Sequence, residues 1–104
     1  MINTVILTGR LVSDPELIEN LETGKKGCII TVAVNRQYKN LEGIYETDFI
    51  RCIIWNPIAD NVKEYCLKGD LIGIKGRLEC LNEELKIVAE KITFLASRNT
   101  KKED

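Results

Sequence analysis

The stretch from Asp48 to Trp55, DFIRCIIW, is apolar on both of the faces that a β-strand would give it. Its short length and its β-branched and aromatic residues predict a strand, in which successive side chains point to opposite sides. One face is uniformly apolar and carries Ile50, Cys52 and Ile54. The other face holds a cation between two large rings, in the order Phe49, Arg51, Ile53 and Trp55. The first face predicts a core contact, and the second is a candidate binding surface.

Four more stretches alternate as strands do, and one has the spacing of a helix. The other predicted strands cover residues 2–12, 27–36, 70–80 and 85–95, with a polar loop from Gln37 to Glu46. The predicted helix follows Pro57, which suits a first helical turn, and Gly69 fits the position just past its end. Its apolar residues at helical spacing are Ile58, Val62, Tyr65 and Cys66.

Five strands with one helix between the third and the fourth is the layout of the OB-fold, an all-β, five-stranded Greek-key barrel. Gly73 and Gly76 suit a strand that must bend at a barrel corner. We therefore expect an OB-fold domain over residues 1–97 and a short polar tail over 98–104. Inward side chains fill so small a barrel, so function is expected on its outer face and in its loops.

The predicted outer face gathers aromatic rings and cations, the combination that single-stranded nucleic acid requires. Bases stack on the rings while lysine and arginine neutralise phosphates, and such a surface binds without reading sequence. The candidate DNA-binding residues are Arg36, Tyr38, Phe49, Arg51, Trp55, Lys75 and Arg77. Two alternatives stay open, namely that another subunit, the helix or a loop covers the rings, and that Lys75 and Arg77 form a plain solvated face. Tyr45 and Tyr65 are assigned to packing.

Composition limits the other functions. The chain has 104 residues, no histidine and a formal net charge of -1, which excludes Ser–His or Cys–His catalysis and argues against a broadly basic surface. It has no phosphate-binding P-loop motif. We expect no enzymatic activity, no cofactor and no metal. Neither a signal peptide nor an apolar run of roughly 20 residues is present, which indicates a cytoplasmic protein.

The four cysteines, Cys28, Cys52, Cys66 and Cys80, are never closer than 14 residues, and no CxxC pair occurs. Alternation places Cys28, Cys52 and Cys80 on the apolar faces of their strands. We expect reduced, buried thiols that act as small hydrophobic side chains, with a metal site or a disulfide as the alternative.

Seven segments in order resemble the bacterial and phage single-stranded DNA-binding protein (SSB) family. They are NTVILTGRL, DPEL, TVAVNR, DFIRCIIW, ADNVKEY, KGDLIGIKGRLE and VAEKITFL, and they cover nearly all of residues 1–96. The resemblance implies an OB-fold that protects single-stranded DNA, without sequence preference, during DNA replication, recombination and repair. It also implies a homo-oligomer, a tetramer with a dimer as the alternative, in which the first strand helps to pair two subunits. Tyr38, Phe49 and Trp55 match the family's stacking aromatics.

Two departures from the family pattern change what the resemblance implies. Many members carry a further tryptophan between the last two strands, where this chain has ECLNEEL. The family's long tail ends in an acidic tip with phenylalanine, whereas KKED has no apolar anchor, so partner recruitment through a tail is not expected. The chain would be a truncated core or a short form from a phage or mobile element. The alternative functions are a primosome-type OB-fold assembly module and an RNA-binding OB domain.

Overall fold

The computed structural model describes residues 1–97, which form six strands and one helix. The strands are β1 (Val5–Leu11), β2 (Glu16–Asn20), β3 (Lys25–Lys39), β4 (Tyr45–Trp55), β5 (Leu71–Leu81) and β6 (Glu84–Ala96). The helix α1 (Ile58–Tyr65) lies between β4 and β5 and directly follows Pro57. The predicted tail, residues 98–104, lies outside the described residues.

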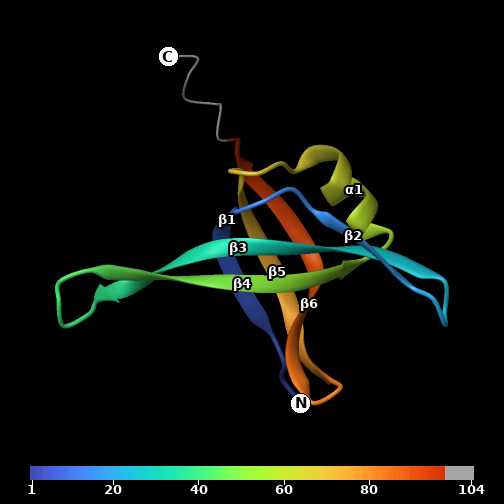
Figure 1. The fold of residues 1–104 in the computed structure, drawn as a ribbon, viewed down its shortest axis with the longest axis horizontal. Helices are drawn as coiled ribbons and strands as arrows, with labels where there is room; N and C mark the ends of the chain where they lie inside the picture. The colour runs from blue at the N-terminus through green and yellow to red at the C-terminus, as the bar shows by residue number, and fades with distance from the viewer. Residues whose placement is uncertain (98–104) are drawn as a thin grey trace.

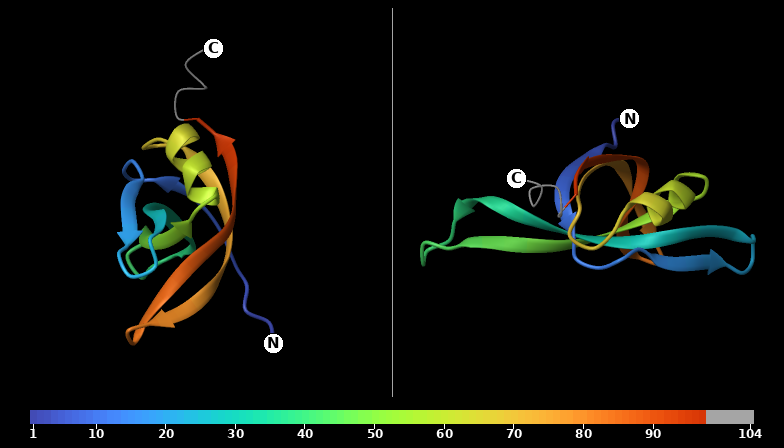
Figure 2. Two further views of the ribbon diagram at one scale, coloured as in Figure 1. Left: turned by 90° about the vertical axis from the view of Figure 1, so that its right-hand side faces the viewer. Right: turned by 90° about the horizontal axis from the view of Figure 1, so that it is seen from above.

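Five of these strands close into a barrel in the order β1-β5-β6-β4-β3, and β3 pairs back with β1. The closing contact between β1 and β3 is short and consists of Arg10↔Ala33 and Leu11↔Val32. The ladders are antiparallel except that between β4 and β6, which is parallel. The view from above in Figure 2 shows the ring, and α1 packs against β3, β4 and β6. The predicted five-stranded OB-fold is confirmed.

The strand β2 was not predicted from the sequence. It pairs with β3 alone, outside the closed ring, from Glu16↔Ile29 to Asn20↔Lys25. Its sequence, ELIEN, lacks a two-residue alternation because neither of its faces is covered by a second layer. The turn that follows β2 is held by the Asn20 side chain, whose Oδ1 accepts hydrogen bonds from the backbone of Glu22 and Thr23.

The strands β3 and β4 form a long two-stranded ribbon that reaches well beyond the barrel on one side (Figure 1), and we call this extension the arm, residues 35–48. The predicted loop from Gln37 to Glu46 is therefore too long, because half of it, residues 37–39 and 45–46, continues the two strands. Only residues 40–44 make the turn, where Asn40 Oδ1 accepts hydrogen bonds from the N–H groups of Glu42 and Ile44 at 2.9 and 3.0 Å.

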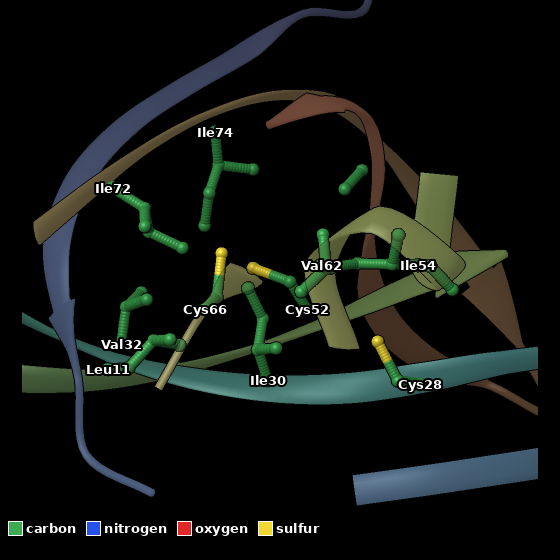
Figure 3. Packing of buried hydrophobic residues seen from close by; sticks show 12 residues of the cluster. Leu11, Cys28, Ile30, Val32, Cys52, Ile54, Val62, Cys66, Ile72 and Ile74 are labelled. Carbon is green, nitrogen blue, oxygen red and sulfur yellow. The ribbon is translucent and has the colours of Figure 1, made fainter. Parts of the chain in front are cut away.

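The hydrophobic core lies between the inward faces of the barrel strands and α1 (Figure 3). Ile30 and Val32 of β3 meet Cys52 and Ile54 of β4 there, as the alternation predicted, and each is almost completely buried. The barrel is closed off by β5 and α1, which contribute Ile72, Ile74, Ala59 and Val62. Each large aliphatic side chain removed from water in this way stabilises the fold by about 1.5–3 kcal/mol.

Two details at the ends of elements differ from the prediction. Cys80 was expected on the inner face of its strand but is exposed, and Leu78 is 37% exposed. The β5–β6 hairpin runs past the barrel at this point, so its nominally inner face has no opposite wall. The helix ends at Tyr65, and Gly69 instead occupies a turn three residues beyond Cys66, with φ of 96°.

The cysteines predict a measurable difference in reactivity. Burial raises the pKa of Cys28 and of Cys52 to about 11 and also raises that of Cys66. Because the thiolate is the reactive species, iodoacetamide at about pH 8 should alkylate Cys80 first in the folded protein. Timed alkylation followed by mass spectrometry would locate the label, and all four thiols should react quickly in concentrated urea. Rapid labelling of Cys52 in the folded protein would contradict the burial described.

Candidate nucleic-acid interface

One face of β4 presents an open row of alternating side chains, which we call the outer row: Tyr45, Thr47, Phe49, Arg51, Ile53 and Trp55. Phe49 is 67% exposed, Arg51 is also exposed, and Trp55 is half-buried. Within residues 1–97, therefore, neither the helix nor a loop covers the Phe49 ring, and the Trp55 ring is partly covered. The two aromatics and the arginine between them face solvent together, as the alternation predicted.

The neighbouring strand β3 places small side chains opposite the large ones of the outer row. Gly27 pairs with Trp55, Thr31 with Arg51, and Ala33 with Phe49. A Cβ atom at Gly27 would overlap the carbonyl oxygen of Ile54 and lie 2.9 Å from Cε3 of the Trp55 ring. Glycine at position 27 therefore leaves the space in which the indole lies over β3.

Two lysines outside the seven candidates stand over rings of the outer row. Lys25 Nζ lies 5.2 Å from the centroid of the Trp55 ring, and Lys39 Nζ lies 5.6 Å from that of Tyr45. Both distances are within the range of a cation–π contact. Lys25 could have been found from the sequence, since it lies two residues before Gly27 and shares its side of β3.

Arg36 does not belong to the outer row. Its guanidinium donates to both carboxylate oxygens of Asp48, at 3.1 and 3.0 Å, and pairs with Glu46 Oε1 at 2.6 Å. The hydrogen bond to Asp48 is the main reason that the pKa of Arg36 is raised, and the same bond lowers the pKa of Asp48. Glu46 and Asp48 occupy the β4 positions between those of the outer row, so this ion-pair cluster lies on the opposite face of the ribbon.

Tyr38 is 66% exposed and lies beside that ion-pair cluster. Its hydroxyl makes the smallest of the contributions to the pKa of Arg36, after Asp48, Glu46 and the burial of the guanidinium. Arg36 and Tyr38 thus lie together on the arm, apart from the row of Phe49, Arg51 and Trp55. The assignment of Tyr45 and Tyr65 to packing is wrong, because these side chains are 54% and 64% exposed.

Lys75 and Arg77 lie on β5, which is not a neighbour of β4. In the barrel order β6 separates the two strands on one side, and β1 and β3 separate them on the other. Lys75 is exposed between Ile6 of β1 and Lys91 of β6. Arg77 is held by Glu79 at 2.6 Å and by Glu90 at 3.1 Å, and hydrogen bonds to these carboxylates raise its pKa. The seven candidates thus fall into three groups rather than one surface.

Arg51 is the cation of the outer row that stays available. It makes no hydrogen bond or ion pair with the residues that the structure describes. The nearest charge identified for it is that of Glu84, at the tip of the β5–β6 hairpin, whose pKa is lowered mainly by Lys86 and slightly by Arg51. Because Glu84 is itself paired with Lys86 at 2.9 Å, Arg51 remains an exposed positive charge between two rings.

The described part of the chain offers little else of chemical note. Among residues 1–97 no three histidine, cysteine, aspartate or glutamate side chains are grouped so that they could hold a metal ion. No helix within the same residues has the length and apolar character to cross a membrane.

The sequence matches a known protein family over almost its whole length. A profile of the single-strand binding protein family matches residues 2–95. The single-stranded DNA-binding protein 3 of Listeria innocua is 41% identical over 107 residues, covering 94% of this chain and 66% of that protein. The single-stranded DNA-binding protein of Bacillus cereus is 42% identical over 108 residues, covering 95% and 63%. The chain thus spans slightly less than two thirds of the length of these relatives, and it belongs to the single-strand binding protein family.

Proposed function

We propose that the chain binds single-stranded DNA without sequence preference and protects it during DNA replication, recombination and repair. The observation that carries the proposal is the outer row, in which the exposed Phe49 and Arg51 and the half-buried Trp55 follow one another on one strand. Unpaired bases stack on such rings, and the intervening cation neutralises the phosphate between them. The role is one of binding and not of catalysis, in keeping with the family.

The polar groups of this face support binding that ignores the base sequence. Asn35 and Thr47 lie beside the rings and could in principle recognise base edges. Thr47 Oγ1 instead donates to Asn35 Oδ1 at 2.7 Å, so the Thr47 proton and the Asn35 carbonyl oxygen are engaged with one another. The row then offers the DNA mainly ring surface and positive charge, which every base and every phosphate can use.

The cations of the proposed interface differ in how readily they can reach a phosphate. Arg51 is unpaired within residues 1–97, and Lys25 lies over the Trp55 ring. Arg36 and Arg77 are also proposed contacts, but their carboxylate partners must be displaced first. Lys75 is exposed on a separate part of the barrel and would bind a strand that wraps from β4 around to β5.

The proposal includes a homo-oligomer, a tetramer first and a dimer second, joined through β1. Beyond its short contact with β3, the strand from Val5 to Gly9 is paired, among residues 1–97, only with β5, which leaves one edge open. The N–H of Leu11 donates to the carbonyl of Asp70, and its carbonyl accepts from Gly69, both just before β5. The N–H of Val12 donates instead to the carbonyl of Thr31 of β3. By alternation the amides of Ile6 and Thr8 face the open edge, and a second copy could pair there.

Oligomerisation would give the interface a useful affinity, because several outer rows could then engage one DNA strand at high effective concentration. The cytoplasm of a bacterial cell, or of one that carries the phage or mobile element encoding the chain, is the compartment we propose. The domain would comprise residues 1–97, and no tail-mediated partner is part of the proposal.

The stacking role predicts that the fluorescence of Trp55 is quenched when oligo(dT) is added. Replacing Phe49 or Trp55 with alanine should weaken binding by about 1–3 kcal/mol at every salt concentration, since stacking does not release counterions. Tyr65→Ala is the matched control, because Tyr65 is an exposed aromatic on α1 and not on β4. Unchanged fluorescence and no binding at low salt would refute the proposal and favour an assembly module, whereas a preference for oligo(rU) would favour an RNA-binding role.

The ion pairs predict that the arginines contribute unequally to salt dependence. Arg51→Ala should reduce the slope of log affinity against log salt by about 0.7, the value for one phosphate contact on a single strand. Arg36→Ala and Arg77→Ala should reduce it less, because a phosphate would replace carboxylates that already neutralise these side chains. Titrations at several salt concentrations would measure the slopes. Equal slopes for the three variants would contradict this division.

The open edge predicts that Thr8→Pro dissociates the oligomer. Proline removes the outward amide donor of Thr8 without removing a hydrogen bond to β5. Thr8→Val keeps the amide and should keep the oligomer. Light scattering would give both masses, and a wild-type protein that is monomeric and still binds DNA at full affinity would refute assembly through β1.

A further inference from the structure

The outer row begins farther out on the arm than the sequence indicated. Tyr45 is the first residue of β4, it is 54% exposed, and it pairs in register with Lys39 of β3. Its separation from Phe49 is four residues, an even number, so both rings project from the same side of the strand.

Side-chain contacts on both sides of the arm establish this assignment. Thr47, between Tyr45 and Phe49 in the outer row, bonds to Asn35 across the ribbon. Arg36 bonds to Glu46 and Asp48 on the other side. The two sets of contacts separate the ribbon into one face with the outer row and one face with the ion-pair cluster.

Tyr45 and Trp55 stand at the two ends of the outer row and have the same kind of partner. Lys25 lies over Trp55 at 5.2 Å from the ring centroid, and Lys39 lies over Tyr45 at 5.6 Å. In both pairs a lysine of β3 covers one side of a ring of β4. Tyr45 is the more exposed of the two rings, and a base that stacks on it would bring its phosphate near the ammonium group of Lys39.

We propose that Tyr45, together with Lys39, forms a further stacking site for single-stranded DNA at the end of the arm. The inference rests on the proposed function and extends it, because the bound strand would then run lengthwise along β4 from Trp55 through Phe49 to Tyr45. Ten residues of extended strand span about 33 Å. The arm thereby lengthens the binding track of one chain beyond the barrel.

The neighbouring Tyr38 provides a matched comparison. It is also an exposed tyrosine on the arm, but it lies on the side of Arg36 and the two carboxylates. Among the described residues a lysine stands over the ring of Tyr45, and none stands over that of Tyr38. Tyr38 remains a candidate contact beside Arg36, and a strand that follows the outer row would meet Tyr45 at its end.

The test compares Tyr45→Ala with the wild-type protein on oligo(dT) of graded length. With about 16 nucleotides the variant should bind about 5-fold or more weakly, whereas with about four nucleotides, which can occupy the centre of the row alone, the two proteins should bind equally. Tyr45→Phe keeps the ring and should retain the wild-type affinity. Tyr38→Ala should lose less affinity than Tyr45→Ala at the longer length.

Two outcomes would overturn the inference. One is unchanged binding of the long oligonucleotide by Tyr45→Ala. If Phe49→Ala and Trp55→Ala still bind weakly, that result removes the arm site and leaves the proposed function standing; if all three variants bind normally, the proposed function fails as well. The other is photocrosslinking of a 5-bromodeoxyuridine oligonucleotide to Tyr38 and not to Tyr45 or Lys39 of the wild-type protein, located by mass spectrometry.

Discussion

The core and the candidate interface both depend on the side-chain alternation of β4. Cys52 and Ile54 are completely buried in the barrel, which obliges Arg51 and Trp55 to face outward. The ladder between β3 and β4 is unbroken from Gly27↔Trp55 to Asn35↔Thr47 and fixes this arrangement. A shift of one residue would exchange the two faces and place an arginine in the core, where an unpaired charge is very unfavourable. The stability of the barrel therefore also holds the outer row in place.

The barrel positions the ribbon but does not enclose it. In the ladder between β4 and β6 only Cys52↔Ile87 and Ile53↔Val88 pair, so β4 is free of this second neighbour over most of its length. Along the arm, Arg36 with its carboxylates on one face and Asn35 with Thr47 on the other tie the two strands together. Exposed ion pairs of this kind stabilise by only about 0–1 kcal/mol. The backbone ladder must therefore carry most of the stability of the arm, which leaves the outer-row side chains available for a ligand.

The net charge is a poor guide to the surface of this protein, because acidic and basic side chains lie on different faces. The formal charge of -1 includes Glu46 and Asp48, which are already paired with Arg36 on the face opposite the outer row. Glu79 and Glu90 are likewise engaged by Arg77 on β5. On the outer face of the ribbon, Lys25, Lys39 and Arg51 border the rings. A weakly acidic chain can in this way present a locally positive surface to a polyanion.

The sequence determines the direction of a side chain in a strand, whereas its surroundings depend on which strands lie nearby. Alternation therefore predicted the buried Cys52 and the exposed Phe49, because both follow from β4 alone. The same rule placed Cys80 inward, and the side chain is nevertheless exposed, since no second layer covers the hairpin there. Similarly, Lys75 appeared to adjoin Arg51 because its strand comes next along the chain, yet β6 lies between them in the barrel.

In the arm, single side-chain contacts also depend on pairing that the local sequence does not predict. Between Asn35 and Lys39 the register shifts, with three residues of β3 opposite one residue of β4, and no local pattern in the sequence announces this. The shift brings Lys39 over Tyr45 while Tyr38 stays beside Arg36. Two tyrosines that read alike in the sequence are thereby given different electrostatic environments, one beside a lysine and the other beside an arginine with two carboxylates. The cross-strand partner, which only the folded ribbon supplies, decides the neighbours of each ring.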